Sequence, residues 1–334
     1  YSDMISKFVE EDRCPPLHCV FLDEAQDLSP LQWDMFFYIE SKCARSYIAG
    51  DDDQTIYSFQ GASPKIFINL KGRFDPQVQS RRVPKSVHKL ATSIFPHMSQ
   101  RLEKEWRPRE AEGVVNMGSD FEELPLHEGN WMILTRTNKM LERLRDHLYS
   151  MNFRFEAKTQ ELLPKKMLNA YRVWKRLHQG AVVDKDEVKD LWDYLTVKDG
   201  HLIRGFSSGK TLENITSINL EGLKAEHGLR ATGSWEQLNF PESSKLYIKK
   251  LLESGDSLMK PARIKLSTIH GVKGEECDNV VLFTDIERII YESATRNPDP
   301  EHRLFFVGIT RAKERLYICS QHYEYQYNIG GPIV

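Results

Sequence analysis

The sequence predicts an α/β fold in which parallel sheets are flanked by helices, with a mostly helical insert in the second half of the chain. Short apolar runs bounded by turn signals recur, and several lead into segments of helical spacing. Residues 19–22 and 131–135 are two such runs, typical of strands buried on both faces of a parallel sheet. From about 164 to 260, aromatic-rich amphipathic segments alternate with polar stretches. This change in the sequence pattern predicts the insert.

The other elements follow from apolar spacing, taken in order along the chain. Residues 79–84 read as a turn leading into a helix, and the charged stretch 101–112, which contains Pro108, as a surface connection. Helices are predicted at 2–11, 30–40, 139–151, 168–177, 188–195 and 301–313, and further strands at 46–49, 264–267, 279–284 and 315–320.

Composition limits the classes of protein that this chain could represent. Its 334 residues are 40% hydrophobic and 28% charged, with a mean hydropathy of -0.51, enough for two or three domains. The sequence shows no apolar run long enough to span a membrane and no signal peptide. It opens at Tyr1 inside a helical pattern, which predicts a piece of a longer protein. Five scattered cysteines predict reduced thiols in the cytoplasm.

Two adjacent acids, Asp23 and Glu24, follow the first predicted strand directly. In open α/β sheets ligands bind at the carboxyl ends of strands, and charge is costly there unless something positive is bound. The pair therefore suggests a nucleotide site, where one acid holds Mg²⁺ and the other activates water. The alternative is a surface turn after a strand, and the pair alone does not separate the two.

The stretch 50–62 follows the second predicted strand with glycine, three acids, a glutamine and two aromatic residues. Gln54 supplies an amide that could sense a γ-phosphate, while Tyr57 and Phe59 offer ring faces for nucleic-acid bases. A solvated loop is the simpler interpretation of the three acids. The net charge of -2 gives no global sign of nucleic-acid binding, so any such contact must come from local surfaces.

Several other polar residues have a structural and a functional interpretation. Arg81 and Arg82 could be a solvated pair or a phosphate contact. His270 alone is more often a structural histidine, and a single arginine such as Arg311 more often a surface residue. The run 205–211 is no phosphate-binding loop, because only three residues separate its glycines and no apolar strand precedes them.

Five stretches, in this order, resemble the motor motifs of the UvrD/Rep family of superfamily 1 DNA helicases. They resemble motifs II to VI and lie at 23–27, 50–62, Arg82, 268–276 and 306–312. The match is closest at 50–62 and 306–312, and the resemblance covers most of the chain outside about 166–260. It implies RecA-like domains of the P-loop NTPase type, with ATP and Mg²⁺ as cofactors and single-stranded DNA as partner.

The resemblance implies a role for each matching residue. Asp23 would bind Mg²⁺, Glu24 would be the general base, and Gln54 would contact the γ-phosphate. Arg82 and Arg311 would stabilise the charge of the transition state. Further nucleotide contacts are implied for Arg81, Gly274 and Glu276, and DNA contacts for Tyr57, Phe59, Thr268 and His270.

The sequence departs from the family pattern in four places. Phe59 replaces a tryptophan, Gln60 replaces an arginine, and Arg81 replaces a tyrosine that stacks on adenine. A guanidinium can also stack, so the last change leaves base preference open. No P-loop precedes Asp23, so the lysine and backbone amides that grip the phosphates are missing from this sequence.

The resemblance also divides the chain. Residues 1–78 would be the C-terminal part of the first motor domain, 1A, and 79–165 with 261–334 the second, 2A, interrupted by a 2B-like insert at 166–260. The function implied is an ATP-dependent DNA helicase or translocase, moving 3′ to 5′ by family, although this chain alone should hydrolyse ATP poorly. The alternatives are a non-catalytic DNA-binding or interaction protein derived from a helicase, and the helicase module of a helicase-nuclease.

Overall fold

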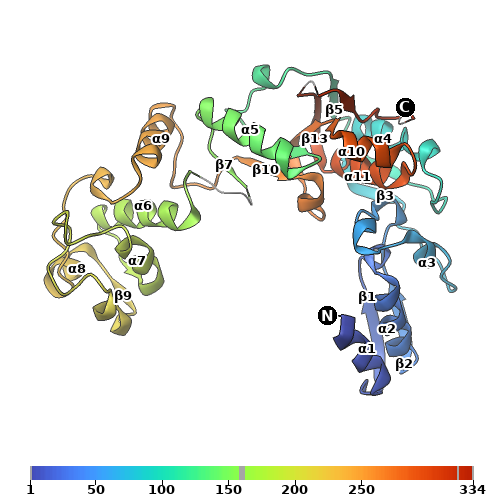
Figure 1. Cartoon of the computed structure of the whole chain (residues 1–334), viewed down its shortest axis with the longest axis horizontal. Coiled ribbons are helices and arrows are strands. Elements are labelled where there is room, and N and C mark those ends of the chain that lie inside the picture. Colours follow the sequence, from blue (N-terminus) through green and yellow to red (C-terminus); the bar gives the residue numbers. More distant parts are fainter. Residues whose placement is uncertain (1, 158–161, 322, 333–334) are drawn as a thin grey trace. The chain divides into compact units, whose positions relative to one another are not determined.

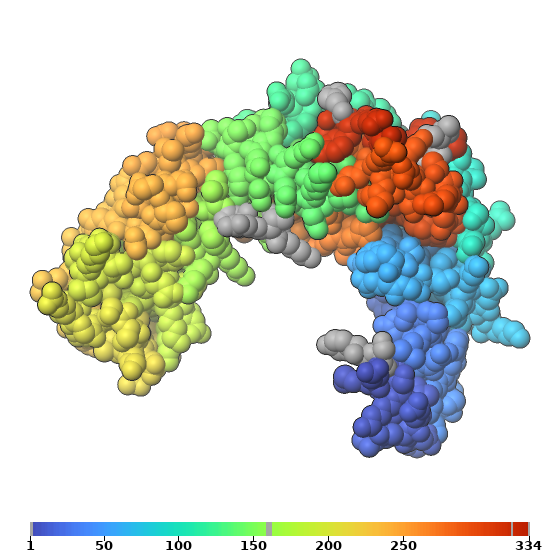
Figure 2. Space-filling model, viewed as in Figure 1, coloured from blue at the N-terminus to red at the C-terminus, as the bar shows by residue number. Residues whose placement is uncertain are grey.

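The computed structural model describes residues 2–157, 162–321 and 323–332, whose surface is coloured along the sequence in Figure 2. The chain forms two compact units. The first comprises Tyr1–Arg143 and Ile264–Val334, and the second comprises Leu144–Arg263. Helix α5 (Asn138–Ser150) crosses the boundary between them.

The first unit opens with a small two-stranded layer. Strands β1 and β2 pair in parallel, with Leu17 opposite Cys43 and Leu22 opposite Ile48. Helix α2 begins with a capping box between Ser29 and Gln32 and buries Trp33 against the strands. Helix α1 packs on α2 (Figure 1). The elements are α1 (Ser2–Glu10), β1 (Leu17–Leu22), η1 (Ala25–Asp27), α2 (Pro30–Glu40) and β2 (Cys43–Ile48).

The prediction that β1 is buried on both faces is wrong. Phe21 is 76% exposed and stacks on the exposed ring of Tyr47 at 5.1 Å on the uncovered face of the pair. Asp23 and Glu24 at the end of this strand are exposed as well. An apolar run reports hydrophobicity, whereas burial depends on which elements cover the strand. These two acids therefore carry no desolvation cost of the kind that the sequence suggested.

The larger sheet of the first unit confirms the α/β class. Its strands within this unit run in the order β5-β13-β11-β6-β10, and each neighbouring pair is parallel. Every residue of β6 is buried, as the sequence predicts. The core beneath the sheet includes residues of α4 and α11. The elements are α4 (Lys85–Thr92), β5 (Val114–Met117), β6 (Trp131–Thr135), β10 (Ile264–Thr268), β11 (Cys277–Phe283), α11 (Asp299–Ile309) and β13 (Ala312–Cys319).

Two segments between the layers differ from their predictions. The predicted turn at 79–84 is strand β3 (Gln79–Pro84), which pairs in parallel with β4 (Arg107–Arg109). The predicted surface connection 101–112 therefore contains a strand, and it also contains the partly buried Lys104. The charged residues of these segments suggested exposed loops. Neither the strand pairing nor the burial of Lys104 could be predicted locally, because the partners lie more than twenty positions away in the sequence.

The predicted helix 301–313 is displaced. Helix α11 ends at Ile309, so Arg311 lies in the turn before β13 rather than on the helix. The remaining elements of the first unit are η2 (Asp52–Gln54), η3 (Ser58–Gln60), α3 (Pro64–Ile68), η4 (Phe95–His97), η5 (Phe121–Glu123), η8 (Ile269–Val272), β12 (Asp285–Ile286), α10 (Arg288–Ala294) and β14 (Tyr325–Gln326).

The second unit is mostly helical and has its own core. Trp174, Leu191 and Leu251, from three of its helices, are buried in that core. The unit runs from Leu144 to Arg263, and the assignment of 166–260 as a 2B-like insert stays a prediction. Its elements are β7 (Phe155–Glu156), α6 (Lys165–His178), β8 (Val183–Asp184), α7 (Lys185–Trp192), η6 (Lys210–Asn214), β9 (Ser217–Ile218), α8 (Leu220–Glu226), η7 (Trp235–Gln237) and α9 (Glu242–Glu253).

Within the described residues, no helix has the length and apolar character needed to cross a lipid bilayer. All five cysteines lie in the described part of the chain and are free thiols.

Candidate nucleotide and DNA site

The turn after β1 holds Asp23 and Glu24 in a strained backbone. Glu24 has φ of 53°, in the left-handed region that non-glycine residues rarely adopt. The Asp23 carboxylate accepts a hydrogen bond from the Glu24 backbone N–H at 2.9 Å, and the buried Gln26 donates from Nε2 to the Glu24 carboxylate at 2.6 Å. The exposed Asp23 carboxylate keeps lone pairs that could bind Mg²⁺ directly or through water.

Lys273 is the cation that faces Glu24. Its side chain, just after η8, is only 9% exposed, and Nζ lies 3.1 Å from the Glu24 carboxylate. The same ammonium pairs with Asp27 and donates to the Gln54 backbone carbonyl at 3.2 Å. Burial raises the pKa of Asp27, and the Lys273 charge opposes that shift. Lys273 therefore ties the turn after β1 to the segment that carries Gln54.

The Gln54 side chain lies between an acid and an arginine. Its Nε2 donates to the Asp51 carboxylate at 2.7 Å, and its Oε1 accepts from Arg311 Nη2 at 3.4 Å. Arg311 is fully buried and also donates to the backbone carbonyls of Val307 and Glu275. The fold thus brings together two residues 257 positions apart in the sequence.

A second arginine, Arg82 on β3, lies close enough to Arg311 to lower its pKa. Arg82 Nη1 lies 4.0 Å from the Glu276 carboxylate, and its buried Nε has no hydrogen-bond partner among the described residues. Burial lowers the pKa of Arg82. Burial, and next the charge of Arg82, lower the pKa of Arg311 to about 9. A buried arginine and a half-buried one with an unsatisfied donor fit an anion such as a phosphate group.

Tyr57, Phe59 and His270 form a ring cluster next to Lys273. The Phe59 ring lies 6.0 Å from that of Tyr57 and 5.5 Å from that of His270, and Tyr57 Oη donates to the His270 carbonyl at 3.4 Å. Lys273 Nζ lies 5.6 Å from the Tyr57 ring centroid. Burial, and next the charge of Arg136, lower the pKa of His270 to about 4, so its ring is neutral near pH 7. Phe59 is 69% exposed, which suits stacking on a base.

Three predicted residues make fewer contacts in this region. Arg81 has an exposed side chain that makes no hydrogen bond or ion pair within the described chain. Gly274 is exposed, with φ of 83°, a value that suits glycine. Thr268 caps η8, since its Oγ1 accepts from the Gly271 N–H at 3.3 Å.

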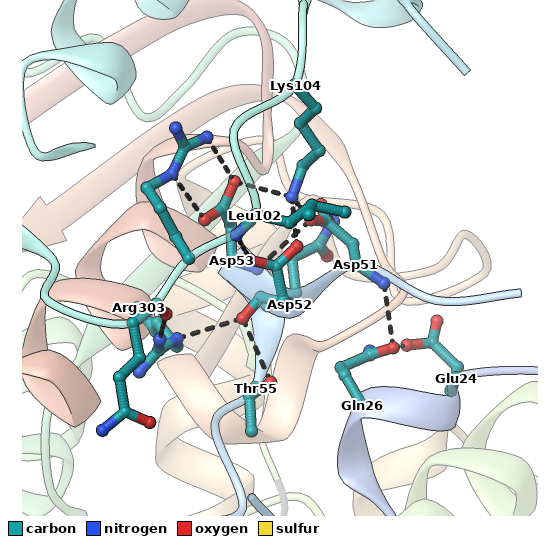
Figure 3. Close-up of polar contacts among 12 residues, drawn as sticks. Glu24, Gln26, Asp51, Asp52, Asp53, Thr55, Leu102, Lys104 and Arg303 are labelled. Carbon is teal, nitrogen blue, oxygen red and sulfur yellow. Dashed lines mark hydrogen bonds and ion pairs between the residues drawn. The ribbon is translucent and has the colours of Figure 1, made fainter. Parts of the chain in front are cut away.

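The acidic cluster Asp51, Asp52 and Asp53 is filled by cations from the 101–112 segment (Figure 3). Lys104 Nζ contacts all three carboxylates, and Arg101 makes a bidentate pair with Asp53. The three acids could form a metal site by their spacing, but the Lys104 ammonium lies where a cation would bind. The simple interpretation of these acids as a solvated loop is therefore wrong, since Asp52 and Asp53 are each 1% exposed.

Comparison with known proteins matches two parts of the chain to family models. The UvrD/REP helicase N-terminal domain matches residues 7–75, and the UvrD-like helicase C-terminal domain matches residues 236–323. A probable DNA helicase of Mycoplasma pneumoniae is 21% identical over 329 residues, which cover 96% of this chain and 45% of that protein. Both matched stretches are of the UvrD/Rep helicase type.

Two further proteins are similar to this chain. A probable DNA helicase II homolog of Mycoplasma capricolum is 20% identical over 409 residues, covering 92% of this chain and 56% of that protein. This UvrD/Rep-type chain thus spans about half the length of both curated relatives. The solved structure of an arterivirus nonstructural protein 10, a helicase, matches 96% of this chain. The match covers 51% of the arterivirus chain, with 10% identity and a TM-score of 0.34.

The two UvrD/Rep matches divide the candidate site between them. The N-terminal match contains Glu24, Gln54 and the rings of Tyr57 and Phe59, and the C-terminal match contains 268–276 and Arg311. Arg82 lies outside both. Contacts between the two matched regions therefore assemble the site.

Sequence reasoning missed three residues that hold this site. Gln26 and Lys273 lie inside the motif-like stretches, where their polarity next to an expected acid was the available signal. Lys104 gave no such signal, because its charged neighbours made the segment read as surface. A lysine is almost never buried without paired charges, so its burial could be known only once its partners were placed.

Proposed function

We propose that the protein to which this UvrD/Rep-type chain belongs is an ATP-dependent DNA helicase or translocase. It would move 3′ to 5′ on single-stranded DNA and unwind duplexes at single-strand/duplex junctions. The observation that carries the proposal is the convergence of Glu24, Gln54 and Arg311 through Lys273 and Asp51. An acid, an amide and a buried arginine in contact are the groups that phosphoryl transfer to water requires.

Each group has a defined task in this proposal. ATP bound with Mg²⁺ supplies the γ-phosphoryl group that is transferred to water. Asp23 would hold the metal through its exposed carboxylate, and Glu24 would orient the attacking water and take its proton. Arg82 and Arg311 would neutralise charge on the phosphate oxygens. Burial is the first cause of the lowered pKa of both arginines, and the nearby charge of Glu276 opposes that shift.

Gln54 would link the nucleotide to DNA. It lies three residues before Tyr57 in the turn that ends in the ring cluster, and bases stacked on Tyr57 and Phe59 would act on that same turn. Base stacking on aromatic side chains contributes about 1–3 kcal/mol per base and tolerates any sequence. Movement along a strand needs such sequence-independent contacts. The 3′ to 5′ direction is proposed from the family resemblance alone.

The residues present fit one side of an ATP site. They offer a metal ligand, a base, an amide and two arginines, but the 334 residues contain no G-x-x-x-x-G-K-[ST] loop. Phosphates therefore lack the lysine and the row of backbone amides that such a loop provides. We propose that this chain alone turns over ATP slowly, and the activity belongs to the natural protein at full length.

The test is the ATPase rate of the full-length protein with and without single-stranded DNA. Glu24→Gln should lower kcat by about 10²–10⁴ through loss of the base, and Arg311→Ala by about 10³–10⁵, with DNA binding retained. The exposed neighbours Glu314 and Arg315 provide matched controls, and Glu314→Gln and Arg315→Ala should keep the wild-type rate.

Two results would contradict the proposal. Absence of DNA-stimulated hydrolysis in the wild-type protein, with DNA binding intact, would favour a non-catalytic DNA-binding protein. Rapid, Glu24-dependent hydrolysis by residues 1–334 alone would show that a P-loop is unnecessary for turnover.

A further inference from the structure

Lys104 occupies the centre of the acidic cluster. Its Nζ lies 2.8 Å from Asp51, 2.5 Å from Asp52 and 2.9 Å from Asp53, and its side chain is 18% exposed. Burial acts to lower the pKa of Lys104, but the three carboxylates outweigh it and raise that pKa above its ordinary value. Lys104 therefore carries its positive charge near neutral pH.

The three acids differ in what else holds them. Asp53 has the two bonds from Arg101, at 3.0 and 2.9 Å, and Asp52 accepts from the Leu102 backbone N–H at 2.7 Å. Both are buried, whereas the Asp51 side chain is 31% exposed. Loss of Lys104 would leave Asp52 and Asp53 with these partners. Asp51 would keep one backbone partner on the oxygen that faces Lys104, the Asp53 N–H at 3.2 Å. Its carboxylate would then be repelled by the two neighbouring carboxylates, which favours a turn toward water.

Asp51 connects this cluster to the ATPase groups. One carboxylate oxygen faces Lys104, and the other accepts from Gln54 Nε2 at 2.7 Å. Its backbone N–H donates to Gln26 Oε1 at 3.0 Å, and Gln26 in turn binds Glu24 (Figure 3). Asp51 therefore fixes the nitrogen end of the Gln54 amide, whose oxygen accepts the longer bond from Arg311.

We propose that Lys104 is a positioning residue: by fixing the Asp51 carboxylate it sets the orientation of the Gln54 side-chain amide. The effect on catalysis rests on the proposed function, in which Gln54 contacts the γ-phosphate, whereas the effect on Gln54 orientation does not. Lys104 touches neither nucleotide nor DNA in this scheme. It acts only through Asp51.

Chemical type and geometry both matter at position 104. An ammonium is a compact charge that three carboxylates can share, whereas a guanidinium is planar and prefers one bidentate partner. Lys104→Arg should therefore restore the charge but only part of the geometry. If Lys104 only neutralised the three carboxylates, Lys104→Arg would restore the full ATPase rate.

The first experiment is a double-mutant cycle on the ATPase of the full-length protein. Lys104→Ala should lower the DNA-stimulated kcat by about 10- to 100-fold, the range seen when a supporting partner is removed, with the KM for ATP changed by less than about threefold. In a Gln54→Ala background the same change should have little further effect, because both remove one interaction. Lys104→Arg should recover part of the rate.

The second experiment reads Gln54 directly. Selective ¹⁵N-glutamine labelling of the full-length protein gives the side-chain amide signals of Gln54, assigned by their loss in Gln54→Ala. Lys104→Ala should shift these signals and speed their exchange with water. Arg154→Met is the matched control, because it breaks a buried ion pair with Asp256 in the other compact unit and should leave the signals in place.

The outcomes separate the two proposals. Suppose that Lys104→Ala shifts the Gln54 signals while the wild-type protein shows no ATPase activity. This pair of results would support the positioning role and reject the proposed function. Unshifted signals, or a full Lys104→Ala effect in the Gln54→Ala background, would overturn the positioning role. If Lys104→Ala does not fold, the neutral Lys104→Gln provides the same test, and unchanged signals there would also overturn it.

Discussion

Among single residues, Lys273 holds together groups that would otherwise repel or lie unpaired. Its ammonium faces two carboxylates, Glu24 and Asp27, and one backbone carbonyl. Asp27 is the more buried of the two acids, and one of its oxygens has no hydrogen-bond partner among the described residues. The charge of Lys273 is therefore the main compensation for the burial of Asp27.

Lys273→Met should destabilise the first unit. Removing one partner of a buried ion pair typically costs about 3–5 kcal/mol, because the other charge stays buried. The pKa of Asp27 is already raised by burial, and it should rise further in the variant. A carboxyl that binds its proton more tightly when folded loses stability as the pH rises. The deficit relative to wild type should thus be largest at pH 7 and shrink toward pH 4.

Denaturant unfolding of wild type and variant at several pH values measures that deficit. Lys189→Met is the control, since Lys189 is an exposed lysine paired across one helical turn with the exposed Asp186. A deficit that is constant with pH would show that Asp27 does not depend on Lys273 for its charge.

At this scale the sequence predicted residue types better than partners. Glu24 and Gln54 were identified from their surroundings in the chain and Arg311 from the family resemblance alone, and the fold brings them into one network. The assignment of their roles stays a prediction. Lys104 was missed because its partners lie about fifty positions earlier, and nothing local to it marks a buried charge.

Among the elements, the layer built on the β1–β2 pair contains two aromatic residues that should contribute very differently to the free energy of unfolding. Trp33 of α2 is fully buried between the helix and the strands, while Phe21 of β1 stacks on Tyr47 at the open face. Area removed from water decides the contribution of an apolar side chain. The two rings therefore make a matched comparison within one small layer.

Trp33→Ala should cost about 3–5 kcal/mol of unfolding free energy, the range for a large buried aromatic. Phe21→Ala should cost less than about 1 kcal/mol, because it loses one exposed cross-strand stack. Denaturant unfolding of both variants of this chain tests the comparison. Equal costs would mean that the Phe21 face is covered in solution.

The elements most easily predicted were those whose periodicity and burial agree. Helix α2 and strand β6 have the predicted bounds, since one has a capping box and an apolar face and the other is buried along its whole length. Strand β3 was predicted as a turn because Pro84 and the arginines suggest one. Its pairing with β4 depends on a segment that the sequence assigned to the surface.

In the whole molecule, two segments each carry residues of both the nucleotide site and the ring cluster. The first, after β2, holds Gln54 and then Tyr57 and Phe59. The second, around η8, holds His270 and then Lys273, which pairs with Glu24. A ligand bound at either site would contact a segment that also carries residues of the other site. Such shared backbone provides a physical route by which DNA could alter ATP turnover.

The double variant Tyr57→Ala, Phe59→Ala tests that route in the full-length protein. Each lost stack should cost about 1–3 kcal/mol of binding to single-stranded DNA, so more DNA should be needed for half-maximal stimulation of the ATPase. Basal hydrolysis without DNA should change little, because Glu24, Gln54 and Arg311 remain. Phe74→Ala is the control, since Phe74 is also exposed but lies outside the ring cluster. Unwinding and DNA affinity equal to wild type in the double variant would refute the stacking role of these rings.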